Sequence, residues 1–305
     1  MGQILEPLYF AVSWVIVTFH SALGVVFGKD SHGSIKWSLS IIGLVILIRI
    51  ILIPLFVKQI KSQRALTALQ PHMKEIQKKY KDDRQKQSEE MMKLYKEHKT
   101  NPLASCFPIL AQAPIFFALF TVLNGIAHNK PHGVLKGDLL TSAADAKFFG
   151  ANLSSSFLST GTNATTKIVT VLLIAFMSLT TFTTQRQLMV KGMPKMDSSN
   201  NMMLQQQKIM LYVFPVIFAV SGVNFPVGVL IYWSTTNLWT LGQQFYVIKR
   251  NPTPGSPAYE ELQAKKAKKG DVSGTDALGA IESGTTLEAP KPSQRKQPKK
   301  AKKKK

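Results

Sequence analysis

The stretch from Leu39 to Val57 contains 19 residues and one ionisable side chain, Arg49. At a rise of about 1.5 Å per residue, a helix of this length measures roughly 28 Å, close to the hydrocarbon thickness of a bilayer. Arg49 lies near the middle, and a guanidinium cannot lose its charge. Placing it there costs at least about 2.5–3.5 kcal/mol, so it has to face a polar or hydrated cavity. The stretch predicts a transmembrane helix in which Arg49 is either a functional residue or a buried structural partner.

Four further apolar segments follow this first span. Several of them carry polar residues that a lipid-facing helix would not need, including Gln112 and Asn237. The loop 128–166 is nearly neutral, whereas the other connections are rich in Lys and Arg. The positive-inside rule then places 58–101, 185–208 and the C-terminus in the cytoplasm. The pattern predicts an all-α multi-pass protein of a bacterial cell membrane, with spans at 39–57, 103–127, 168–184, 209–223 and 227–248.

The N-terminal region 1–38 has two possible interpretations. Residues 4–28 are apolar enough to form a span, but they also contain Glu6, Pro7 and His20 among aromatic side chains. Such a mixture is also typical of a helix that lies in the membrane interface. The first interpretation gives six spans and a cytoplasmic N-terminus. The second gives a five-helix core (39–57 and the spans of 102–248) and an outer N-terminus.

The polar segment 58–101 has the pattern of a helical hairpin. It carries 12 Lys or Arg against 6 Asp or Glu, and an apolar seam repeats at spacings of three and four residues. Pro71 should bend the first helix or mark its start, and Asp82 with Gln85 resembles a capping signal for the second. We expect the seam to pack against the face carrying Met91 and Tyr95. The seam consists of Leu66, Leu69, Met73, Ile76 and Tyr80.

The C-terminal region 249–305 has the composition of a disordered basic tail. It carries 15 basic against 6 acidic residues, and its last 15 residues contain nine Lys or Arg and no acid. Such a run binds polyanions, either lipid headgroups or the phosphates of RNA. A merely solubilising tail is the alternative.

The residues give little support to an enzyme. The single cysteine, Cys106, excludes an intramolecular disulfide and a cysteine-based metal cluster, and no phosphate loop or paired-histidine motif is present. Ser178, Ser221 and Ser234 have no histidine at membrane depth, which argues against a membrane hydrolase. We therefore expect no catalytic residue, metal or cofactor. An anion channel or secondary transporter with Arg49 as its site is an open alternative, although the spans show no inverted repeat.

Long stretches of the chain resemble the YidC-type membrane protein insertases. The resemblance is carried by IRIILIPLFVKQIKSQ around Arg49, by LQPHMKEIQKKYKDDRQKQSEEMMKLYKEHKTNPLASCFPILAQAPIFFALF, and by FPVGVLIYWSTTNLWTLGQQ at 225–244. It covers about residues 4–250 and is closest in form to the shorter bacterial members. The resemblance implies a five-helix core around a hydrophilic groove, a cytoplasmic hairpin and an interfacial helix at 4–28.

The resemblance also implies a function and a set of partners. The groove would contain Arg49 as its positive charge, with Gln185 and Trp233 at positions that match the polar partners of the family, and with Gln112 and Asn237 as further polar residues. Nascent membrane proteins would be the substrates, the ribosome would bind through the basic tail, and the Sec translocon and anionic lipids would be further partners.

Overall fold

The computed structural model describes residues 2–27, 33–98, 100–101, 107–193 and 202–268, and it is mostly helical. Its contacts divide the chain into two units, Met1–Leu262 and Gln263–Lys305, and the first unit contains the packed helices. In chain order the elements are α1 (Gly2–Phe27), α2 (Gly33–Ile51), α3 (Ile53–Ala68), α4 (Gln70–Lys79), α5 (Arg84–Glu97), α6 (Phe107–Ala127), α7 (Asp138–Ala144), β1 (Lys147–Phe148), β2 (Ala151–Asn152), α8 (Ala164–Gln187), the π-helix η2 (Leu188–Gly192), α9 (Met202–Gly222), α10 (Val227–Arg250) and α11 (Pro257–Lys268).

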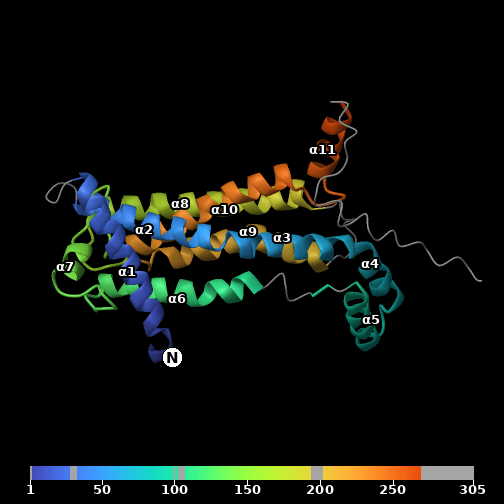
Figure 1. Cartoon of the computed structure of the whole chain (residues 1–305), viewed down its shortest axis with the longest axis horizontal. Helices are drawn as coiled ribbons and strands as arrows, with labels where there is room; N and C mark the ends of the chain where they lie inside the picture. The colour runs from blue at the N-terminus through green and yellow to red at the C-terminus, as the bar shows by residue number, and fades with distance from the viewer. Residues whose placement is uncertain (1, 28–32, 99, 102–106, 194–201, 269–305) are drawn as a thin grey trace, which may run out of the picture. The chain divides into compact units, whose positions relative to one another are not determined.

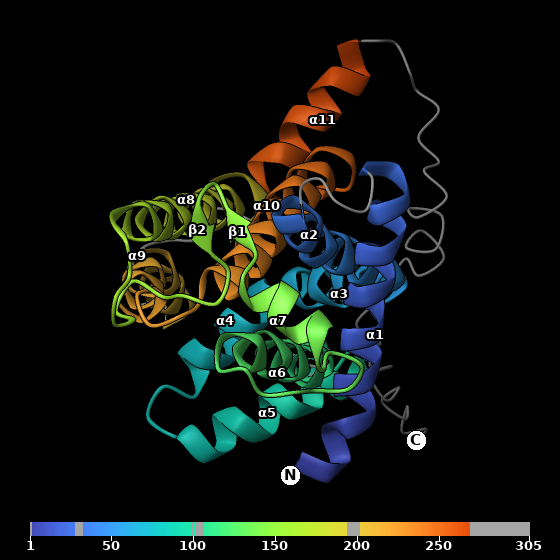
Figure 2. The same ribbon diagram turned by 90° about the vertical axis from the view of Figure 1, so that its left-hand side faces the viewer.

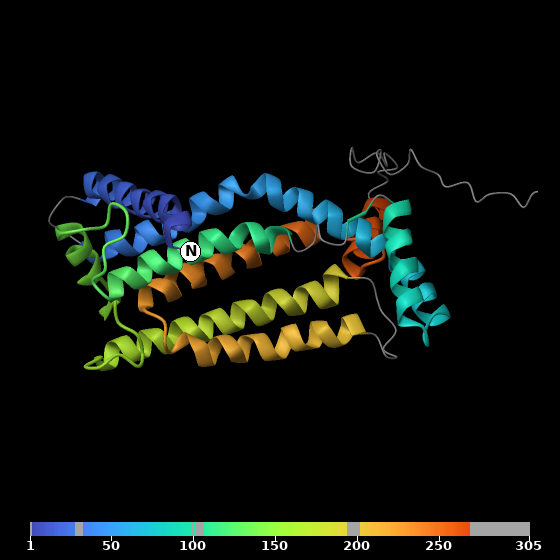
Figure 3. The same ribbon diagram turned by 90° about the horizontal axis from the view of Figure 1, so that it is seen from below.

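The Arg49 span is longer than the apolar run that predicts it. Its helix begins at Gly33, and backbone hydrogen bonds of 3.0 Å continue through Leu52, from Leu52 N to Ile48 O and from Phe56 N to Leu52 O. Pro54 has no amide hydrogen and cannot donate to the carbonyl of Ile50, which explains the bend between α2 and α3 (Figure 3). The two helices together span 33–68, about 54 Å at 1.5 Å per residue, so α3 extends beyond the thickness of a bilayer.

The helices α2, α6, α8, α9 and α10 run side by side, and α10 holds the group together (Figure 1, Figure 3). α10 packs against α8, α2 and α6, whereas α9 packs mainly against α8. The described part of the chain contains three helices that are long and apolar enough to cross a membrane, at Leu5–Phe27, Ser34–Ile51 and Ala164–Gly192, and shorter apolar helices at Gln112–Ala127 and Leu211–Gly222. The protein is therefore a mostly helical membrane protein, and the helix that contains Arg49 begins several residues before Leu39.

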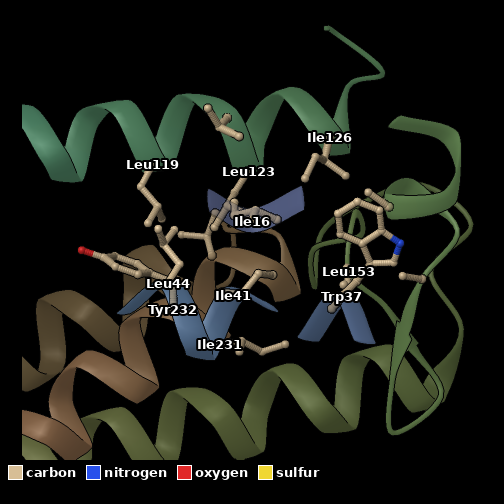
Figure 4. Packing of buried hydrophobic residues seen from close by; sticks show 14 of the residues in the cluster. Ile16, Trp37, Ile41, Leu44, Leu119, Leu123, Ile126, Leu153, Ile231 and Tyr232 are labelled. Atoms are coloured by element: carbon tan, nitrogen blue, oxygen red, sulfur yellow. The ribbon is translucent and has the colours of Figure 1, made fainter. Parts of the chain in front are cut away.

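The buried core lies where α1, α2, α6 and α10 meet. Figure 4 shows Ile16 of α1, Leu44 of α2 and Leu123 of α6 close together, with Ile231 of α10 below Ile41, and all four are buried in one cluster. Leu153, from the segment after β2, and Trp37 continue the cluster toward residues 128–163. The apolar cluster fixes α10 against α2 and α6, which positions the polar residues further along these helices.

α1 lies across the other helices instead of beside them. In the view of Figure 2, α6, α8 and α9 are seen nearly end-on, while α1 runs lengthwise over α2 and α6. Its contact with the rest of the chain includes a loop: Ser13 Oγ accepts a hydrogen bond of 3.1 Å from the Val134 amide, and the rings of Tyr9 and His132 meet edge-on at 5.5 Å. α1 thus crosses α2 and α6, although it is itself long and apolar enough to cross a membrane.

The residues between α6 and α8 form a folded segment, 128–163, which we call the cap. It contains α7 and a short antiparallel hairpin in which Phe148 pairs with Ala151. Ser142 of α7 accepts a 3.0 Å hydrogen bond from the Trp37 indole. The carbonyls of Leu153 and Ser155 accept from the Gly228 and Val227 amides, both at 3.0 Å, and so cap the start of α10. The cap therefore joins α2 to α10 at one end of the bundle.

The polar segment forms a pair of helices, α4 and α5, that pack against each other (Figure 1). Pro71 lies in the first turn of α4, so the helix ends at Ala68 and restarts at Gln70. The capping prediction was one residue off. Asp83, not Asp82, is the N-cap of α5, and its carboxylate accepts a 2.9 Å hydrogen bond from the Lys86 amide.

The structure is helical over part of the region for which composition predicts a disordered tail. α10 continues to Arg250, and Pro257–Lys268 forms α11, whereas composition predicts disorder from Lys249. The Ser256 side chain accepts from the Tyr259 amide at 3.3 Å at the start of α11. The most basic part of the tail, 291–305, lies outside the described residues, as does Cys106.

Candidate functional site: a buried arginine on α2

Arg49 is only 9% exposed although it belongs to an apolar helix. Its Nη2 donates to the Thr240 hydroxyl at 3.1 Å and to the Thr236 carbonyl at 3.4 Å, both on α10. Its guanidinium carbon also lies 5.5 Å from the centre of the Phe56 ring, within the range of a cation–π interaction. The charge of Arg49 is therefore held between α10 and the start of α3.

The charge is not neutralised inside the described part of the chain. No described carboxylate lies within ion-pair distance of Arg49. Both of its hydrogen bonds come from Nη2, and among these residues the hydrogens on Nε and Nη1 form no further bond. A buried cation with unused donors can bind an anionic or carbonyl group from outside the chain, because an unsatisfied buried donor is costly.

Tyr232 and Gln112 extend this polar region toward α6. Tyr232 is buried on α10, and its hydroxyl lies near Gln112, Thr236 and Arg49. Figure 4 shows this hydroxyl pointing out of the apolar cluster. The side-chain carbonyl oxygen of Gln112 is buried, and it has no hydrogen-bond partner among the described residues. We call this group the Arg49 cluster; it consists of Arg49, Gln112, Tyr232, Thr236 and Thr240.

Asn237 lies on a face of α10 that contacts α8, the helix that carries Gln185. Asn237 Nδ2 donates to the Thr181 hydroxyl at 3.1 Å and to the Met177 carbonyl at 3.5 Å, both on α8. Gln185 comes one helical turn after Thr181 on α8 and is half-buried. The structure thus places Asn237 at the contact of α8 and α10, with Gln185 on the same side of α8.

Trp233 is part of an aromatic cluster that joins three helices. Its ring meets Phe218 of α9 edge-on at 4.7 Å, Phe116 of α6 at 5.6 Å, and Phe225 at 5.8 Å. This cluster is the aromatic link between α9 and the helices α6 and α10. Among the described residues, Trp233 forms no hydrogen bond with Arg49.

The structure brings only part of the predicted set together. Gln112 joins Arg49 through Tyr232, whereas Gln185, Asn237 and Trp233 occupy neighbouring faces and, among the described residues, do not hydrogen-bond Arg49. Sequence reasoning missed Thr236, Thr240 and Tyr232. The signal was present, because these three are spaced by four residues in the apolar span 227–248 and must share one helix face.

The predicted seam residues are distributed over two helices. Leu66 belongs to α3, Met73 and Ile76 belong to α4, Leu69 is buried at the junction, and Tyr80 caps α4. On the facing helix, Leu94 is buried, and the Tyr95 hydroxyl contacts the Met73 sulfur at 3.8 Å. Burial raises the pKa of Tyr95 above its ordinary value, which already lies well above neutral pH.

The sequence matches the family of the 60Kd inner membrane protein over residues 27–254. It is 58% identical over 255 residues to a membrane protein insertase YidC of Streptomyces avermitilis, an alignment that covers 81% of this chain and 59% of the relative. It is 40% identical over 290 residues to the YidC insertase of Tropheryma whipplei strain Twist, covering 88% and 93%. A YidC insertase of Bifidobacterium longum is 33% identical over 99% of this chain and 95% of that protein.

Among solved structures, an active YidC insertase with its first transmembrane domain resolved matches 75% of this chain and 46% of its own, with 26% identity and a TM-score of 0.46. The chain spans 59% of the length of the Streptomyces relative, but nearly the whole length of the Tropheryma and Bifidobacterium relatives. The family match covers well over half of the sequence and includes the whole Arg49 cluster. The chain belongs to the family of the 60Kd inner membrane protein and the YidC membrane protein insertases.

Proposed function

We propose that this chain inserts newly made membrane proteins into the bilayer, by offering a hydrated intramembrane groove to the polar segment of its substrate. The observation that carries the proposal is Arg49, a charge buried between apolar helices with unused donors and no described carboxylate partner. The names of the similar proteins support the same activity.

The Arg49 cluster gives the proposal a physical mechanism. A polar region within the membrane shortens the hydrocarbon path that a hydrophilic tail has to cross. Arg49 attracts acidic residues of that tail, and the unpaired oxygen of Gln112 accepts hydrogen bonds from water or from the backbone of the substrate. The apolar part of the substrate then moves into lipid, driven by its own burial. No covalent step is needed.

The orientation follows from the charges. With the basic segments 58–101 and 185–208 and the C-terminus in the cytoplasm, the cap lies on the outer side and α1 lies in the outer interface. The groove then opens toward the cytoplasm, where substrates arrive. Anionic lipids, the ribosome and the Sec translocon are the partners that this position makes available.

Reconstitution in liposomes tests the proposal directly. The substrates are two single-span proteins that differ only in their translocated tails, one acidic and one neutral, and insertion is measured by protease protection. The Arg49→Ala variant should lose most insertion of the acidic substrate, whereas Arg49→Lys should keep much of it because the charge remains. Arg186→Ala serves as the control, because Arg186 is an exposed arginine at the end of α8.

Two results would contradict the proposal. Equal insertion of both substrates by wild type and by Arg49→Ala would remove the electrostatic role of Arg49. Uptake of a labelled anion by the same liposomes, lost in Arg49→Ala and without insertion of either substrate, would favour an anion channel or transporter instead.

A further inference from the structure

Phe149 has an unusual conformation for an aromatic residue. It occupies the tip of the β1–β2 hairpin with φ at 49°, in the left-handed region, and the next residue, Gly150, has φ at 83°. Two consecutive positive φ values are typical of the tight turn that joins two antiparallel strands, where Asn, Asp and Gly are the favoured residues. A bulky side chain in this position is unfavourable for the backbone.

Burial within the chain does not compensate for this conformation. The Phe149 side chain is 80% exposed, and its described ring contact is an edge-on meeting with Phe148 at 4.6 Å. A large exposed aromatic ring on a strained turn can be stabilised only by burial against something outside the chain. The position of the tip indicates what that is.

The tip lies at the beginning of an exposed apolar stripe on α8. A side-chain carbon placed on Gly150 would come within 3.1 Å of Thr165 Cγ2, so the tip touches the first turn of α8. Ile168, Leu172 and Leu179 follow Thr165 by 3, 7 and 14 residues, which places them on one face of the helix, and all three are exposed. This face belongs to one of the helices long and apolar enough to cross a membrane, so in a bilayer we expect it to face lipid chains.

The charges around the tip fit a lipid headgroup layer. Lys147 is exposed two residues before Phe149, and the amine of Lys167, beside Ile168 on α8, lies 5.9 Å from the ring of Phe157. Aromatic rings with neighbouring lysines are favoured at the boundary between hydrocarbon and headgroups, where the amine reaches phosphate and the ring is partly buried.

We infer that the β1–β2 tip is a membrane anchor, in which Phe149 enters the lipid layer above the α8 stripe and Lys147 and Lys167 bind headgroup phosphates. In the proposed orientation this is the outer leaflet. The anchor fixes the depth of the cap in the membrane. Because the cap is hydrogen-bonded to the start of α10, it also fixes the depth of α10, whose Thr240 accepts a hydrogen bond from Arg49. The inference depends on the protein being in a membrane but not on the insertase activity.

Site-directed spin labelling of the full chain in liposomes tests the anchor. The only cysteine, Cys106, is replaced by serine, and a nitroxide is attached to Phe149→Cys. Leu172→Cys, on the stripe, is the lipid reference. Asn129→Cys is the aqueous reference, since Asn129 is an exposed cap residue that also has a positive φ of 52°. Power saturation with oxygen and with a water-soluble nickel complex then gives the depth of each label.

We expect the label at Phe149 to be reached by oxygen in preference to nickel, nearer in behaviour to Leu172 than to Asn129. Nickel access equal to that at Asn129 would overturn the anchor. A label that neither reagent reaches would also overturn it, because a protein partner or a second copy would then cover the tip.

The label at position 149 replaces the phenylalanine itself, so a second experiment places the label elsewhere and keeps Phe149. A label at Thr165→Cys reports the depth of the first turn of α8. Adding Phe149→Ser should move this label measurably toward water, whereas Lys136→Ser, a change at another exposed cap residue, should not. An unchanged depth after Phe149→Ser would show that the tip does not anchor the cap.

Discussion

Thr240 orients the guanidinium of Arg49 through a short chain of hydrogen bonds. Its hydroxyl donates to the Thr236 carbonyl at 2.8 Å, which leaves the oxygen lone pairs free to accept from Arg49 at 3.1 Å. Hydrogen bonds to charged groups contribute about 1.5–3 kcal/mol. Thr240 is thus a positioning residue: it does not need to touch the substrate, but it decides where the charge points.

The Thr240→Val variant keeps the shape of this side chain and removes the acceptor. We expect insertion of the acidic-tailed substrate to fall about tenfold, the equivalent of about 1.4 kcal/mol, and insertion of the neutral one to change little. Thr240→Ser should restore insertion because it keeps the hydroxyl. Thr235→Val is the matched control, since among the described residues the Thr235 hydroxyl donates only to the Ile231 carbonyl of its own helix. An equal loss with both substrates would indicate a general packing defect.

The site was predictable where an isolated residue carries the signal. Arg49 stands out because a permanent charge within a 19-residue apolar segment is energetically costly in a membrane. This prediction requires no knowledge of which residues surround Arg49 in the fold. Thr240 is not conspicuous, because threonines in apolar helices commonly bond to their own backbone, as Thr180 does on α8. Its role arises only when α10 is packed against α2, and sequence spacing does not give that contact.

At the scale of elements, the attachment of α1 to the cap depends on a close approach at Gly133. This residue has φ at 57°, and a Cβ there would collide with Ser13 Oγ and lie 2.8 Å from the Phe10 Cα. Gly133→Ala should therefore loosen α1, expose its amides to hydrogen exchange and lower the melting temperature in detergent. Gly137→Ala is the control, because Gly137 has nearly the same φ, 56°, with nothing within 4 Å of a Cβ. Equal effects of the two substitutions would mean that backbone strain, not the contact with α1, is responsible.

The α4–α5 pair makes most of its described contacts within itself and with α3. Replacing residues 70–97 with a flexible Gly/Ser linker should therefore leave the membrane helices folded, with an unchanged melting temperature of the core, while insertion is lost if the pair recruits the substrate. Asp83→Ala is a milder variant that removes the cap of α5 and should cost the pair about 1 kcal/mol. A deletion variant that cannot be purified as a folded protein would instead make the pair a structural part of the core.

Element boundaries were the least predictable part of the fold. Apolar content marks where a helix lies in lipid, but α2 begins at Gly33 and α3 continues to Ala68 because helical hydrogen bonding does not stop at the membrane surface. The choice between Asp82 and Asp83 as a cap depends on backbone angles that both residues could adopt. α11 is polar, and composition alone assigns such a segment to disorder.

At the scale of the whole molecule, the basic residues are concentrated away from the membrane helices. Residues 269–305 contain 10 Lys or Arg and 4 Asp or Glu, a net charge of 10 − 4 = +6. Nine of these cations belong to 291–305, which has no acid at all. An insertase that works during translation operates beside a ribosome whose surface is largely RNA, and the anionic lipid of the inner leaflet competes for the same charges at about 1 kcal/mol per cation.

Truncation after Lys268 removes this charge and leaves α11 complete. In nanodiscs of neutral lipid, the truncated protein should co-sediment with ribosomes more weakly than the full chain. If six or more phosphates are neutralised, the binding constant of the full chain for ribosomes should fall by about three orders of magnitude or more between 50 and 200 mM salt. Truncation should make the binding constant less dependent on salt. Insertion of small, fully synthesised substrates should remain, since the Arg49 cluster is intact. A chain with Lys and Arg of 291–305 replaced by Gln serves as the control for length. Ribosome binding that is the same for all three proteins at every salt concentration would leave the tail without this role.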